Sequence, residues 1–131
     1  MRVPRLSTLT PRQLLAVDAA GAAMTAVTTA LVLPALFGAL GLPPWFFVSF
    51  GAAATALCLV STVSALGARH RASLRFVALG NLAYVTASLV VTATAWATVS
   101  PLWLGYLVFE TVVMLTLVRI EWRAASSGVP A

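Results

Sequence analysis

Carboxyl, amide and phenol side chains interrupt the otherwise apolar stretches of this sequence, and the principal ones are Asp18, Asn81, Tyr84 and Glu110. Glu110 is the clearest case, because the surrounding segment LGYLVFETVVMLTLV (104–118) contains no other charged residue. Carboxyl groups exchange protons or bind cations, and amides and phenols form hydrogen bonds. The chemistry available to these residues is therefore proton exchange, or the binding of a polar group at an apolar site.

Helical spacing gives these residues neighbours. Asn81 and Tyr84 are followed by further polar residues at steps of four, which draws one polar stripe along a helix. Counted at about 1.5 Å per residue from the arginine-bearing ends of their segments, Asp18, Asn81 and Glu110 lie about 6, 10 and 13 Å deep, at nearly matched levels. Helical geometry allows one site with Asp18, Asn81, Tyr84 and Glu110 at its centre. These four are the candidates for binding a ligand or a proton, and the candidate lining residues are Cys58, Thr62, Ser88 and Tyr106.

Each central residue also has a purely structural interpretation. Asp18 could form an ion pair with Arg12 or Arg75 near the end of the helices, and Asn81 and Tyr84 could simply join helices by hydrogen bonds. Glu110 fits such an interpretation least well. An ion pair with Arg119 is excluded, because nine residues at 100° each place the two side chains on opposite faces of one helix. A protonated Glu110 bonded to Asn81 or Tyr84 would be structural, whereas one that exchanges its proton with a ligand would be functional.

The elements that carry these residues are membrane-spanning helices. The chain is 61% hydrophobic and 8% charged, against about 25% charged residues in a soluble domain. Four apolar runs reach the roughly 20 residues that a helix needs to cross a bilayer. The sequence predicts an all-α, antiparallel four-helix transmembrane bundle over residues 11–123, with spans at about 14–33, 45–66, 74–98 and 102–120 and with tails at 1–10 and 124–131.

The arginines set the expected orientation. All eight precede the first span, flank the loop between the second and third spans, or close the fourth span. By the positive-inside rule both termini are then cytoplasmic, in a multi-pass protein of the cell membrane. Thr10 and Gln13 predict a capping box that starts the first helix at Pro11, and Pro34 should kink or end that helix near the outer surface.

Several classes of chemistry lack the residues they need. The single cysteine cannot form an internal disulfide, and the single histidine cannot build a metal site without partners. The dispersed glycines form no phosphate-binding loop. No metal or other cofactor is expected, and the arginines, scattered on short segments, do not predict nucleic-acid binding.

The order of these motifs resembles a known pattern. An acid early in the first span, GNLAY (80–84) in the third and GYLVFE (105–110) in the fourth are similar to a group of small bacterial four-helix integral membrane proteins of unassigned function. The resemblance implies no activity. It implies that Asp18, Asn81, Tyr84 and Glu110 are the positions of interest.

We therefore favour a non-catalytic binding or accessory membrane protein with a polar intramembrane site in its cytoplasmic half. The expected partners are the lipid bilayer, a small lipophilic ligand, and another membrane protein or a second copy of the chain. One alternative is a proton-coupled small transporter or channel subunit. Another is a membrane enzyme that uses Glu110 as acid or base on a lipophilic substrate.

Overall fold

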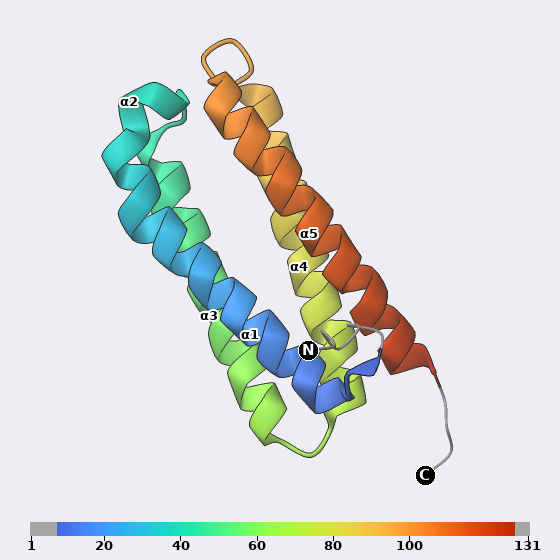
Figure 1. Ribbon diagram of the computed structural model, residues 1–131. Helices are drawn as coiled ribbons and strands as arrows, with labels where there is room; N and C mark the ends of the chain where they lie inside the picture. Colours follow the sequence, from blue (N-terminus) through green and yellow to red (C-terminus); the bar gives the residue numbers. More distant parts are fainter. Residues whose placement is uncertain (1–7, 128–131) are drawn as a thin grey trace, which may run out of the picture.

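The computed structural model describes residues 8–127, and within them the chain forms an antiparallel bundle of four long helices (Figure 1). All four are long and apolar enough to cross a membrane. This confirms the expected fold class. The long helices are α1 (Pro11–Val27, extended by further helical turns to Leu36), α3 (Pro44–Leu66), α4 (His70–Thr94) and α5 (Pro101–Ser126).

The helices α1 and α5 begin where a side chain accepts a hydrogen bond from one of their first backbone N–H groups. At α1 the predicted capping box is confirmed: the backbone N–H of Gln13 donates to Thr10 Oγ1 at 3.3 Å, and that of Thr10 donates to Gln13 Oε1 at 2.9 Å. Ser100 caps α5 by accepting from the N–H of Trp103 at 3.2 Å. α4 differs from the expected span, because it starts at His70 and ends at Thr94.

The far end of the first span departs from regular α-helix around Pro34, as expected. A π-helical turn (Thr28–Val32) and a 3-10 segment (Leu33–Leu36) lead into the short helix α2 (Phe37–Leu40). Proline lacks the N–H that a continuing helix would use, which explains the break. Gly41 then turns the chain at φ +72. Its carbonyl accepts from Thr98 Oγ1 at 2.9 Å, which ties this turn to the α4–α5 connection.

The bundle consists of two closely packed pairs. α1 packs mainly on α3 and α5 mainly on α4, whereas α1 and α5 touch little. Two apolar clusters fill the interior, a larger one centred on Phe46 and Trp103 and a smaller one formed by Leu14, Leu15, Leu74, Val77 and Ala125.

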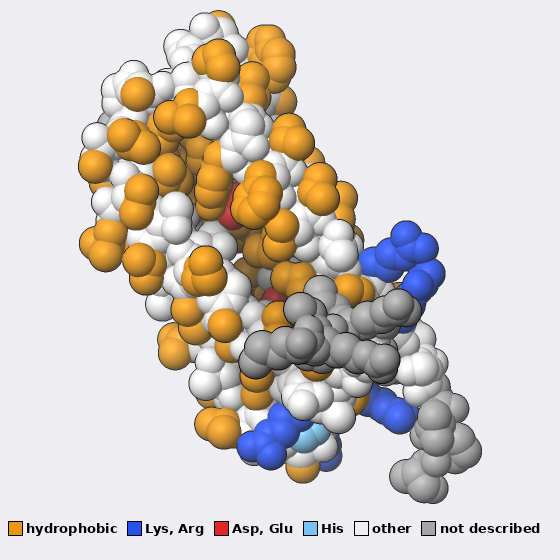
Figure 2. All heavy atoms as spheres, viewed as in Figure 1, with side chains coloured by type: hydrophobic (Ala, Val, Ile, Leu, Met, Phe, Trp, Pro, Cys, Tyr) orange, Lys and Arg blue, Asp and Glu red, His pale blue; other side chains and the backbone are white. Residues whose placement is uncertain are grey.

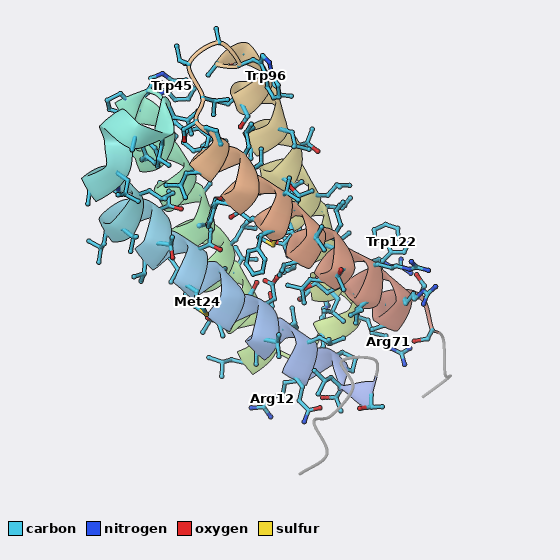
Figure 3. All side chains as sticks on the ribbon, turned by 45° about the horizontal axis from the view of Figure 1, so that its top comes forward. Arg12, Met24, Trp45, Arg71, Trp96 and Trp122 are labelled. Atoms are coloured by element: carbon cyan, nitrogen blue, oxygen red, sulfur yellow. The ribbon has the colours of Figure 1, made fainter. Side chains whose placement is uncertain are left out.

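The two ends of the bundle differ in character. Arg12 and Arg71 lie at one end, with Trp45 and Trp96 at the other (Figure 3). The basic side chains on the face drawn in Figure 2 gather toward this arginine end. The start of α1 and the end of α5 also lie there (Figure 1).

Candidate functional site

Asp18 lies at the centre of a polar cluster inside the bundle. Its Oδ2 accepts a hydrogen bond from Ser61 Oγ of α3 at 2.5 Å, and its Oδ1 accepts one from Asn81 Nδ2 of α4 at 2.5 Å. All three side chains are buried, with at most 2% of their surface exposed. These bonds replace the expected ion pair with Arg12 or Arg75, both of which are exposed.

The last long helix, α5, contributes Glu121 to the same cluster. Its side chain is fully buried and its carboxyl group faces Asp18 and Asn81. Neither carboxyl oxygen of Glu121 has a hydrogen-bond partner among the described residues, and Asn81 Oδ1 also lacks one. We call Asp18, Ser61, Asn81 and Glu121 the acid cluster. It brings together one side chain from each long helix.

Glu110 occupies a separate layer, farther from the arginine end. It lies eleven residues before Glu121, about 16 Å along α5. The sequence predicts nearly matched depths for Glu110 and Asn81, and this prediction is wrong because α5 does not end at Arg119 but continues to Ser126. Glu110 is buried, and its Oε1 accepts from Tyr106 Oη at 3.3 Å, one turn away on the same helix.

Tyr84 belongs to the layer of Glu110. Its hydroxyl lies near Glu110 and near Thr29 of the first span, and its ring packs edge-on against Phe50 at 5.3 Å between centroids. The structure thus divides the predicted centre. Asp18 and Asn81 are hydrogen-bonded near the arginine end, while Tyr84 and Glu110 lie near each other in the layer farther from that end.

A cleft of about 250 Å³ connects the two layers along the side of the bundle. It lies between α1 and α5, and we call it the α1–α5 cleft. Asp18 and Leu117 line one end of it, and Thr28 and Tyr106 line the other, about 15 Å away along α1. Glu110 lines the cleft near this second end. Figure 2 shows acidic side chains recessed in a hollow of this face.

The other expected lining residues have different positions. Tyr106 lines the α1–α5 cleft. Ser88 is buried on the polar stripe of α4, and its hydroxyl has no partner among the described residues. Cys58 is half-buried and does not line this cleft. The prediction for Thr62 is corrected: its side chain is exposed and donates to the backbone oxygen of Cys58 at 2.7 Å.

Two residues of the acid cluster were missed from the sequence. Ser61 directly precedes Thr62, so the predicted face of α3 was wrong by one residue, or about 100° of rotation. Glu121 lies between Arg119 and Trp122 at the end of an apolar run and resembles an interfacial residue. Its spacing from Glu110 was the available signal, because eleven residues at 100° each return to within about 20° of the same face.

The polar atoms of the acid cluster are carboxyl, hydroxyl and amide oxygens and one amide nitrogen. Across the described residues, no three His, Cys, Asp or Glu side chains gather as a metal site would require. The arrangement can accept hydrogen bonds and hold positive charge, and the α1–α5 cleft adds apolar walls beside it. No protein-family model, curated protein or solved structure matches the chain.

Proposed function

We propose that this chain is a multi-pass membrane protein that binds a lipophilic ligand in the α1–α5 cleft. The main support for this proposal is an apolar cleft that is lined by two buried carboxyl groups, those of Asp18 and Glu110. Ligand sites are typically concave and apolar, with a few polar groups that fix the orientation of the ligand. Buried carboxyl groups are costly in a bilayer and mark functional positions there.

The lining indicates the chemistry of the ligand. The cleft offers hydrogen-bond acceptors at Asp18 and Glu110, and none of the described residues that line it is basic. A ligand with an apolar body and an amine or hydroxyl head complements these walls, whereas a carboxylate does not. Met24 and Phe109 flank the cleft and are 72% and 67% exposed, on surfaces that would face lipid. The ligand therefore enters sideways from the bilayer.

Binding fits this geometry better than catalysis. An enzyme on a lipophilic substrate would hold its acid or base in an enclosed pocket, so that water is excluded during the reaction. The α1–α5 cleft is instead open along the side of the bundle. We place the arginine end in the cytoplasm by the positive-inside rule, with the protein in the cell membrane. The ligand-bound protein then serves as an accessory to a second membrane protein or to another copy of itself.

Photolabelling tests the binding site directly. The purified protein in detergent micelles is illuminated with a long-chain alkylamine, alcohol or carboxylate, each carrying a diazirine in its chain, and the labelled residues are mapped by mass spectrometry. We expect the amine and the alcohol to label the cleft walls, at positions such as Met24 and Val113, and the carboxylate to label them much less.

Two glycine variants provide a matched comparison. A Cβ atom added at Gly21 or at Gly105 would have no neighbouring atom within 4 Å. Gly21 lines the α1–α5 cleft, whereas Gly105 does not. Gly21→Leu should fill the cleft and abolish wall labelling, and Gly105→Leu should leave it unchanged. Equal labelling of Gly21→Leu and the parent protein would show that the probes bind elsewhere and would refute the proposed site.

A further inference from the structure

The acid cluster contains more hydrogen-bond acceptors than donors. Both oxygens of Asp18 accept bonds, from Ser61 and Asn81. Both oxygens of Glu121 and Oδ1 of Asn81 are buried without any partner among the described residues. An unpaired buried acceptor costs about 1–3 kcal/mol, and more when it is charged. Two facing carboxylates at this point would therefore be unstable without a positive charge between them.

Among residues 8–127 no side chain supplies that charge. The polar groups that face the pair are Ser61 from α3 and Asn81 from α4, and neither is a cation. The described arginines of α1, α4 and α5 and of the α3–α4 loop all have exposed side chains, whereas Asp18 and Glu121 are buried. Buried charges in proteins are paired or neutralised. The described part of the chain therefore gives the pair no cation of its own.

We propose that Asp18 and Glu121 together hold one exchangeable proton. The proton resides on Glu121, whose hydroxyl then donates to the Asp18 carboxylate. This assignment converts an unpaired acceptor into a donor and leaves one negative charge, which Ser61 and Asn81 already stabilise. The pair reaches the exterior through Asp18, which lines the α1–α5 cleft as well as the acid cluster.

The composition of the chain permits an unusually clean test. Asp18, Glu110 and Glu121 are its only acidic residues, so Glu110→Gln leaves the proposed pair as its only carboxyl side chains. Infrared spectroscopy distinguishes a protonated carboxyl group from a carboxylate. We expect this variant to show one protonated-carboxyl band at neutral pH, which shifts when the protein is moved into heavy water. Adding Glu121→Gln should remove the band.

Three further measurements complete the design. Circular dichroism and melting in detergent establish that the double variant folds. If it does not fold, 13C labelling of the glutamate carboxyl in the Glu110→Gln protein assigns the band to Glu121 without a second substitution. A neutral-pH spectrum without a protonated-carboxyl band refutes the proposal.

Discussion

The hydroxyl of Ser61 provides the sharpest test of how the bundle is packed. Ser61 and Thr62 are neighbours on α3 with opposite environments. Ser61 is fully buried and donates to Asp18, whereas Thr62 is exposed and donates to a carbonyl of its own helix. Truncation of each side chain to alanine removes one hydroxyl from one helix. The pair therefore isolates the contribution of the buried hydrogen bond.

The magnitude follows from the partner that is left behind. Ser61→Ala removes one of the two donors to a buried carboxylate, and a buried acceptor left unpaired costs about 1–3 kcal/mol. Hydrogen bonds between membrane helices average about 0.6 kcal/mol and reach about 1.7, and alanine recovers up to about 0.5 kcal/mol in helix propensity. We expect Ser61→Ala to lower the free energy of unfolding by about 1–2 kcal/mol.

Thr62→Ala should change the free energy of unfolding by less than about 0.5 kcal/mol, as exposed substitutions usually do. Reversible unfolding of both variants in mixtures of mild detergent and dodecyl sulfate gives the comparison. If Ser61→Ala is as stable as Thr62→Ala, the hydroxyl of Ser61 does not bond Asp18, and the face of α3 in the bundle is misassigned.

Other predictions concern the turn, the cleft and the orientation. Gly41→Ala should destabilise the fold by more than about 2 kcal/mol in the same unfolding assay, because its left-handed backbone disfavours a side chain and the added Cβ would lie 1.7 Å from the Thr98 oxygen. Glu110→Gln should melt near the parent temperature because an amide also accepts a bond from the tyrosine, whereas Glu110→Leu should melt lower. With Cys58 replaced, a membrane-impermeant thiol reagent applied to whole cells should modify Ala97→Cys and spare Ala68→Cys, and the reverse pattern would invert the proposed orientation.

The sequence predicted the bundle and the polar face of α4 well. Asn81, Tyr84, Ser88 and Thr92 are all buried, as their spacing indicated. Such a stripe depends only on the geometry of one helix, which periodicity describes directly. The four spans followed from length and apolarity for the same reason, since both are properties of a continuous segment.

The levels at which helices meet were not predictable in this way. They depend on where each helix starts and ends, and an error of a few residues moves a side chain by a whole turn. This is why the sequence places Asn81 at nearly the depth of Glu110, although Asn81 bonds Asp18 and faces Glu121. The choice between Ser61 and Thr62 required the rotation of α3 about its axis, and its largely apolar sequence gives little indication of which side faces inward.

The acid cluster also has a consequence for assembly. Lipid tails are as apolar as leucine. Helices in a bilayer that carry only apolar side chains therefore gain little free energy from one mutual alignment over another. Sliding a helix by one residue moves its side chains about 1.5 Å along the axis and turns them by about 100°. Such a shift of any one helix would remove the side chain that this helix contributes to the acid cluster, and the hydrogen-bond partner of that side chain would be left unpaired. Four polar side chains at one level can thus select a single alignment for helices that would otherwise have many.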